Sequence, residues 1–142
     1  MICTFFGHRD APAEVEDVLK GVLIDLTKNN NISLFYVGNQ GGFDSIVKRV
    51  LEGLGVKYYV VLAYMPGKID PICPIDYSKT IYPEGLENTP PKFAITKRNN
   101  WMIEKSDLVI TYVTKSFGGA YNFKQKAIKK GKTVVEISEA IM

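Results

Sequence analysis

The chain has few of the residues on which metal sites and disulfides depend. Of its 142 residues only two are cysteines, Cys3 and Cys73, and only one is a histidine, His8. A zinc site built from His and Cys alone needs about four ligands, so this composition excludes an ordinary one. We therefore expect no metal site and no cofactor.

Long apolar runs and a basic leader are also missing. No run approaches the roughly 20 apolar residues that span a bilayer, and the first residues, MICTFF, do not form a signal peptide. The net charge of +3 is too small and too scattered to indicate nucleic-acid binding. We expect a cytoplasmic protein whose partner is a small anionic molecule rather than a membrane or a nucleic acid. A homodimer or a higher homo-oligomer stays open.

Three common catalytic motifs do not occur. The chain has no phosphate-binding loop of the G-x-x-x-x-G-K-[ST] type and no nucleophile elbow. The G-x-G-x-x-G pattern is missing after the first expected strand, where Gly7, His8 and Arg9 stand instead. These absences count against ordinary ATP hydrolysis, serine-hydrolase chemistry and NAD-dependent dehydrogenation.

Strand-like and helix-like segments alternate along the chain. Apolar and β-branched runs predict strands over residues 2–6, 32–37, 58–63, 108–113 and 133–137. Apolar residues at helical spacing predict helices over residues 12–29, 43–54, 90–106 and 120–130, with Gly131 as a C-terminal cap. This alternation predicts a single α/β domain over residues 1–142, a Rossmann-like three-layer sandwich of about five parallel strands with helices on both faces.

A long proline-rich loop is predicted over residues 64–91, which hold six of the seven prolines. Loops of this length in a compact domain are usually functional or disordered. Its tyrosines, Tyr64, Tyr77 and Tyr82, could stack on a base, and Glu84 is its most interesting carboxylate.

Two glycine turns, each between an expected strand and an expected helix, say most about function. The first runs from Gly38 to Asp44 and the second from Ser116 to Ala120. Glycines let the backbone approach a bulky anion, and the amides of the following helix supply donors. Since ligands of such sheets bind at the carboxyl ends of the strands, we expect one crevice for a nucleotide or a nucleotide derivative. The candidate ligand-binding residues are Gly7, His8, Arg9, Asn39, Gln40, Gly41, Gly42, Asp44, Tyr64, Pro66, Arg98, Ser116, Gly118, Gly119 and Ala120.

Several of these residues have a structural interpretation as well. Asp44 could cap a helix by accepting backbone N–H groups, or it could hold ribose hydroxyls. Arg9 and Arg98 could neutralise phosphates, although Arg9 could equally be a surface charge. His8 has no histidine partner for a proton relay. Trp101, on the same predicted helix as Arg98, could be a core residue or a stacking platform. Asn39 and Gln40 could read the edge of a base or a sugar.

Five motifs in order resemble a known superfamily over nearly the whole chain. They are CTFFGHR at residues 3–9, FYVGNQGGFD at 35–44, VLAYMPG at 61–67, RNNWM at 98–102 and SFGGA at 116–120. Together they resemble small bacterial proteins of the SLOG superfamily, and most closely its YpsA/YoqJ-like branch. The resemblance implies a Rossmann-like fold and a pocket for nucleotide-derived ligands. It also implies that DprA-type DNA-processing proteins, LOG-type phosphoribohydrolases and sensor domains for ADP-ribose-like signals are relatives.

The second glycine turn departs from the LOG pattern P-G-G-x-G-T-x-x-E. Phe117 replaces the proline, Tyr121 the third glycine and Asn122 the threonine, and Gln125 takes the place of the glutamate. A neutral amide cannot replace the carboxylate that supports N-glycosidic cleavage. The preferred hypothesis is therefore a sensor or sequestering module for an ADP-ribose-like or other phosphorylated nucleoside. The alternatives are an N-glycosidic hydrolase or transferase, with Asp44, Glu84 and Arg98 as catalytic candidates, and a protein-interaction module.

Overall fold

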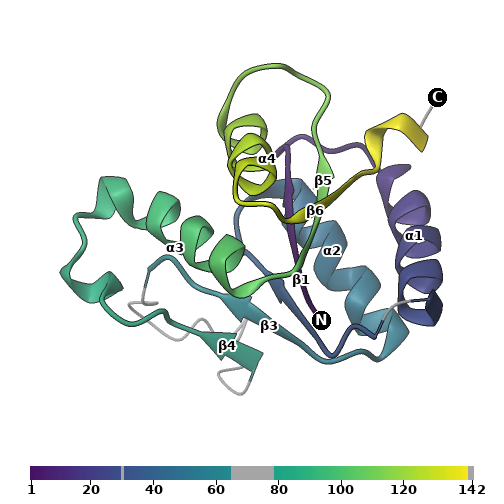
Figure 1. Ribbon diagram of the computed structural model, residues 1–142, viewed down its shortest axis with the longest axis horizontal. Coiled ribbons are helices and arrows are strands. Elements are labelled where there is room, and N and C mark those ends of the chain that lie inside the picture. Colours follow the sequence, from purple (N-terminus) through teal and green to yellow (C-terminus); the bar gives the residue numbers. More distant parts are fainter. Residues whose placement is uncertain (30, 65–78, 141–142) are drawn as a thin grey trace.

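The computed structural model describes residues 1–29, 31–64 and 79–140. Helices and strands alternate along these residues, and helices cover both faces of one sheet (Figure 1). The strands are β1 (Ile2–Gly7), β2 (Leu34–Val37), β3 (Tyr58–Val61), β4 (Thr80–Ile81), β5 (Leu108–Tyr112) and β6 (Thr133–Glu136). The α-helices are α1 (Val15–Asn29), α2 (Gly41–Leu54), α3 (Pro91–Lys105) and α4 (Gly119–Lys129), and short 3₁₀ turns occur at Leu86–Asn88 and Ser138–Ala140.

The sheet is parallel throughout, in the order β4-β3-β2-β1-β5-β6. The chain builds outward from β1 to β4 and then returns to place β5 on the other side of β1, with Phe5 paired to Ile110. Strand order therefore reverses between β1 and β5, at the centre of the sheet. Ligands of open parallel sheets bind outside the carboxyl ends of the strands at such a point.

Side chains of β1 alternate between two cores, as the two-residue period of a strand requires. Cys3 and Phe5 pack into the larger core beneath α1 and α2, together with buried Leu19 and Val47. The next residue, Phe6, lies on the opposite face in a second core with residues of α3 and α4. Burial on both faces explains why β1 and β5 read as continuous apolar runs in the sequence.

The predicted fold class is confirmed, with one strand more than expected. The additional strand, β4, is only two residues long and pairs with β3 through Val60 and Thr80. It lies within the segment predicted as a loop over residues 64–91, where so short a strand leaves no periodic pattern. Residues 65–78 of that loop lie outside the described part of the chain.

Element ends differ from the predictions by a few residues. Helix α1 begins at Val15 rather than near residue 12, because residues 12–15 form a turn closed by the bond from the Val15 N–H to the Pro12 carbonyl. Strand β3 ends at Val61 instead of residue 63, and α2 begins two residues early, at Gly41. The predicted cap at Gly131 is confirmed, since this residue has φ 75° and donates to the Ile128 carbonyl at 3.0 Å.

Within the described residues, we find no helix with the length and apolar character needed to cross a membrane.

Candidate functional site

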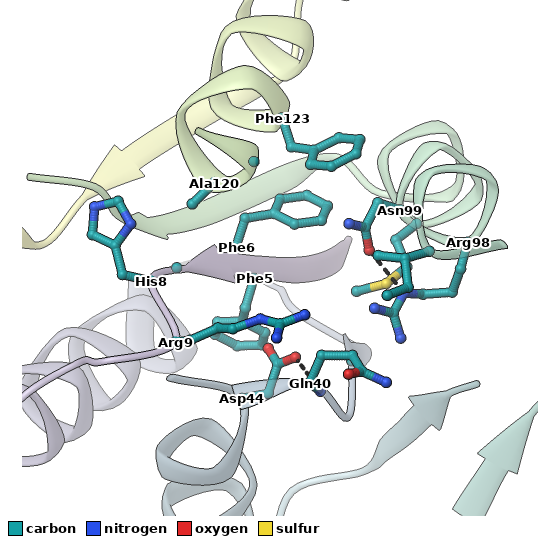
Figure 2. Close-up of a pocket in the computed structure, with 15 residues that line it drawn as sticks. Phe5, Phe6, His8, Arg9, Gln40, Asp44, Arg98, Asn99, Ala120 and Phe123 are labelled. Carbon is teal, nitrogen blue, oxygen red and sulfur yellow. Dashed lines mark hydrogen bonds between the residues drawn. The ribbon is translucent and has the colours of Figure 1, made fainter. Parts of the chain in front are cut away.

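A cavity of about 290 Å³ opens at the carboxyl ends of β1 and β2, between α3 and α4. Figure 2 shows charged and polar side chains on one side of it and phenylalanine rings on another. Its lining residues are Phe5, Phe6, Gly7, His8, Arg9, Gly38, Gln40, Asp44, Ile95, Arg98, Asn99, Met102, Gly119, Ala120 and Phe123. Both predicted glycine turns therefore contribute to a single cavity.

Arg98 enters the cavity from α3 and is only 2% exposed. Its Nε donates to Asn99 Oδ1 at 2.8 Å, and its Nη1 donates to the Val61 carbonyl at 2.9 Å and to Asn39 Oδ1 at 3.3 Å. Burial lowers the pKa of the guanidinium, and the nearby Asp44 carboxylate opposes this shift. Nε and Nη1 thus bind protein oxygens, and among the described residues Nη2 has no hydrogen-bond partner, so it is the nitrogen available to a ligand.

Asp44 lies in the first turn of α2 and is half-buried. Its Oδ2 accepts the backbone N–H of Gln40, the residue before the helix, at 2.9 Å. Burial raises the pKa of this carboxyl to about 6, while the Gln40 hydrogen bond and the charges of Arg98 and Lys48 pull the pKa downward. The predicted capping role is thereby confirmed, and the same carboxyl also faces the cavity.

Gly38 allows Asp44 and Arg98 to meet at the end of β2. A Cβ at this position would lie 2.7 Å from Asp44 Oδ2 and 3.3 Å from both Cζ and Nη1 of Arg98. No side chain fits there without moving one of the two charged groups. The absence of a side chain at Gly38 is therefore part of the construction of the site.

Arg9 follows β1 directly, and its backbone supports the start of α2. The Arg9 carbonyl accepts the Gly42 N–H at 2.8 Å, and a Cβ on Gly42 would lie 2.5 Å from that oxygen. Gly41 has φ 88° and also lies against Arg9, with Arg9 Cγ 2.7 Å from the position of a Cβ. The exposed Arg9 side chain extends over the cavity on the side of Asp44 and Gln40 (Figure 2). Gly41 and Gly42 thus serve the site through packing.

His8 joins the two loops that flank the strand-order reversal. Its Nε2 accepts the backbone N–H of Thr114 at 2.9 Å, and its ring meets Tyr112 edge-on at 5.9 Å. A nitrogen that accepts a hydrogen bond carries no proton, so Nε2 is the acceptor nitrogen of the ring and Nδ1 is left as the donor. His8 thereby fixes the start of the loop that leads to α4.

The second glycine turn brings the N-terminus of α4 to the cavity. Gly118 has φ 95° and precedes the helix, and no side chain caps this end. Gly119 and Ala120 line the cavity, and a Cβ on Gly118 or Gly119 would meet nothing within 4 Å. The first amides of a helix have no acceptor inside it, so this end offers donors and partial positive charge.

An apolar wall that the sequence analysis did not anticipate faces these polar groups. The rings of Phe6 and Phe123 stack at 5.6 Å with 22° between their planes, and Ile95 and Met102 also line the cavity. Phenylalanines in a central strand and a helix have the pattern of core residues, so only the cavity between α3 and α4 distinguishes them. Trp101 lies outside the lining and packs on Tyr36, which confirms the core interpretation.

The comparisons with known proteins show the fold. Neither protein-family models nor curated proteins give a match to the chain. Among solved structures, the X-ray structure of DNA processing protein A (DprA) from Streptococcus pneumoniae matches with a TM-score of 0.71 at 19% identity, over 94% of this chain. The fold is Rossmann-like. The chain spans about half of that protein's length, since 49% of it is covered.

The Rossmann-like cavity does not include every predicted ligand-binding residue. Tyr64 is 43% exposed and donates through its hydroxyl to the Pro91 carbonyl at 3.0 Å. Asn39 contributes only through its bond to Arg98. Ser116 and Glu84 are exposed on loops and do not line the cavity. Pro66 and Tyr77 lie outside the described residues.

No group of three or more His, Cys, Asp or Glu side chains within residues 1–29, 31–64 and 79–140 is arranged to hold a metal ion.

Proposed function

We propose that the cavity binds one nucleoside unit of a phosphorylated, nucleotide-derived ligand, and that the protein acts as a sensor or sequestering module. The observation that carries this proposal is the division of the cavity into three kinds of surface. Anion-binding groups lie at the α4 end, a carboxyl lies at the start of α2, and an apolar aromatic wall lies between α3 and α4. These match the phosphate, the sugar and the base of a nucleotide.

The phosphate is assigned to the first turn of α4, and the exposed Arg9 side chain would turn toward it from its position beside Asp44 and Gln40. Gly119 and Ala120 line the cavity there, and a Cβ on Gly119 would meet nothing within 4 Å. Helix N-termini bind phosphate through these donors and the helix dipole. The Asp44 carboxylate would repel a phosphate, which favours the α4 end over the α2 end.

The sugar is assigned to Asp44. A carboxylate accepts hydrogen bonds from two vicinal hydroxyls, and the Gln40 N–H fixes the orientation of this carboxyl. The volume of about 290 Å³ lies just below the roughly 300–1,000 Å³ typical of small-molecule sites. One nucleoside with its phosphate fits this space better than a whole dinucleotide, whose second half would extend into solvent.

A second candidate function, hydrolysis or transfer at an N-glycosidic bond, is favoured by one observation. Burial raises the pKa of Asp44 to about 6, close to the range in which a carboxyl can exchange protons at neutral pH. Against this function, Gln125 replaces the expected glutamate and does not line the cavity. We rank binding without turnover first for that reason.

DNA processing, the role in the name of the similar protein DprA, has less support in this chain. Two lysines in and directly after α4 pair with carboxylates, Lys124 with Glu136 at 2.9 Å and Lys130 with Glu104 at 3.6 Å. Paired lysines do not form the free basic surface that binds nucleic acid. We further propose, from the order of the five sequence motifs, that the chain belongs to the YpsA/YoqJ-like branch of the SLOG superfamily.

A thermal-shift screen followed by recovery of the ligand tests both candidate functions. The purified protein is heated with AMP, GMP, NAD, ADP-ribose and cyclic ADP-ribose, and each stabilising ligand is recovered and weighed by mass spectrometry. We expect at least one ligand to raise the melting temperature and to return intact. A cleaved ligand would replace the sensor with a glycosidic-bond enzyme, and no shift with any nucleotide would contradict both.

A further inference from the structure

The inner end of the cavity holds a polar side chain that the proposed function has not used. Asn99, on α3, is only 8% exposed and lines the cavity next to Arg98. Its Oδ1 accepts from Arg98 Nε at 2.8 Å. Because an arginine nitrogen can only donate, the atom facing it must be the amide oxygen, and this fixes the direction of the amide nitrogen.

The amide nitrogen of Asn99 is free to contact a ligand. No acceptor among the described residues receives a hydrogen bond from Nδ2, and Figure 2 shows this nitrogen pointing toward the side of the cavity where Phe6 and Phe123 lie. Among the described residues, no buried side-chain nitrogen or oxygen lacks a hydrogen-bond partner, so the unbonded Nδ2 of Asn99 is accessible from the cavity. A ligand that offers an acceptor beside the aromatic wall would satisfy it.

We propose that Asn99 and the Phe6–Phe123 pair form a nucleobase subsite, in which Asn99 Nδ2 donates to a ring nitrogen or carbonyl of the base. This inference rests on the proposed nucleotide-binding function and assigns one end of the ligand. The stacked rings, 5.6 Å apart, supply an apolar surface for a planar group. The neighbouring Nη2 of Arg98 supplies a further donor. A planar base stacks on aromatic side chains, whereas a charged phosphate does not, so the base is the part of the ligand that fits here.

The substitution Asn99→Asp tests this assignment with little structural change. Aspartate keeps an oxygen for Arg98 Nε but replaces the donor nitrogen with a second acceptor, which repels the acceptor on a base. Asn100→Asp is the matched control. It makes the same change one residue away, where Asn100 Oδ1 accepts from Lys126 at 2.7 Å and the side chain does not line the cavity.

Calorimetric titration of these proteins with AMP, GMP, CMP, UMP and ribose 5-phosphate separates the base from the rest of the ligand. Wild type is expected to bind at least one nucleotide roughly tenfold or more tightly than ribose 5-phosphate. Asn99→Asp should weaken that nucleotide roughly tenfold and leave ribose 5-phosphate nearly unchanged, which controls for the added charge. Asn100→Asp should bind both as wild type does.

A second pair of variants tests the aromatic wall independently. Phe123→Leu should weaken the nucleotide roughly tenfold, whereas Phe93→Leu, on the exposed start of α3, should not. If ribose 5-phosphate binds as tightly as every nucleotide, or if Asn99→Asp and Phe123→Leu both bind nucleotides as wild type does, the base subsite is wrong and the phosphate and sugar assignments stand. If none of the five compounds binds, the proposed function fails and the subsite fails with it.

Discussion

The Asp44 carboxyl accepts the backbone N–H of Gln40 at 2.9 Å, and this bond makes one side chain both a helix cap and a wall of the cavity. The cap fixes the carboxyl at the point where β2 turns into α2. It also holds the carboxyl in surroundings that disfavour its charge, because burial there raises its pKa. Asp44 therefore both stabilises the start of α2 and places a carboxyl with a raised pKa in the cavity.

Replacing Asp44 with asparagine should stabilise the protein at neutral pH. The pKa rises from 3.8 to about 6 on folding, so the folded state binds this proton more tightly, and the stability that the group contributes is greatest below pH 4 and falls as the pH rises through 6. Asparagine keeps an oxygen for the Gln40 N–H but never ionises. In urea unfolding, Asp44→Asn should match wild type near pH 4 and exceed it by about 1–3 kcal/mol near pH 7.5. The exposed α1 variant Asp25→Asn is the control, and a difference between Asp44→Asn and wild type that does not grow with pH would contradict the prediction.

Gly38→Ala should impair binding, because its Cβ would lie 2.7 Å from Asp44 Oδ2 and displace the carboxyl or the Arg98 guanidinium. We expect a nucleotide affinity at least roughly tenfold lower and a stability loss of about 1–3 kcal/mol from overpacking. Gly53→Ala, in α2 with no neighbour within 4 Å of its Cβ, should keep full affinity and be neutral or slightly more stable. Titration calorimetry and urea unfolding give the two readouts. Equal affinity of Gly38→Ala and wild type would remove Gly38 from the site.

Glu136 should matter for stability rather than for binding. Its carboxylate accepts from Thr111 Oγ1 at 2.7 Å, from the Val113 and Ser138 N–H groups at 2.9 and 3.0 Å, and from Lys124 Nζ at 2.9 Å. Burial pushes its pKa upward, but these hydrogen bonds outweigh burial and hold the pKa below 4.5. Its contribution is thus present above pH 4.5 and disappears as the pH falls through the lowered value.

The substitution Glu136→Gln should therefore cost about 1–3 kcal/mol in urea unfolding at pH 7. One of its two oxygens becomes an NH₂ group that faces other donors. Glu139→Gln, an exposed change three residues later, should cost almost nothing. Equal unfolding midpoints for the two variants would contradict this account.

His8→Ala should loosen the loop that precedes α4. The substitution removes the nitrogen that accepts the Thr114 N–H at 2.9 Å. This hydrogen bond joins the loop after β1 to the loop after β5. Hydrogen exchange followed by mass spectrometry should show faster exchange at residues 114–118 and unchanged exchange in α1. If the exchange rates at residues 114–118 match wild type, His8 does not hold this loop.

The sequence predicted those parts of the site that depend on local chemistry. The glycines of both turns, the residues after β1 and the first turn of α2 were identified because turns and helix starts have strong local signals. Strand β4 was missed because two paired residues in a proline-rich segment leave no pattern. Its pairing depends on β3, about 20 residues earlier.

The inner half of the cavity could not be predicted in the same way. Asn99 and Phe123 lie on different helices, and their faces become a binding wall only when α3 and α4 pack over β1. Gly38 stood within a predicted motif, but its role depends on Arg98, which arrives from a helix sixty residues later. Contacts between residues this far apart in the sequence depend on how the helices pack, and the pattern of a single segment does not predict them.

The central claim, that the cavity binds a nucleotide with its phosphate at Arg9 and α4, is tested most directly by calorimetry on a charge reversal. Arg9→Glu changes an exposed side chain and keeps the backbone bond to Gly42, so folding should be preserved. The exposed α1 variant Lys20→Glu carries the same change in charge far from the cavity. We expect AMP, GMP, CMP or UMP to bind wild type and Lys20→Glu alike, and to bind Arg9→Glu at least roughly tenfold more weakly. Equal affinities for all three proteins, or no binding by any of them, would contradict the claim.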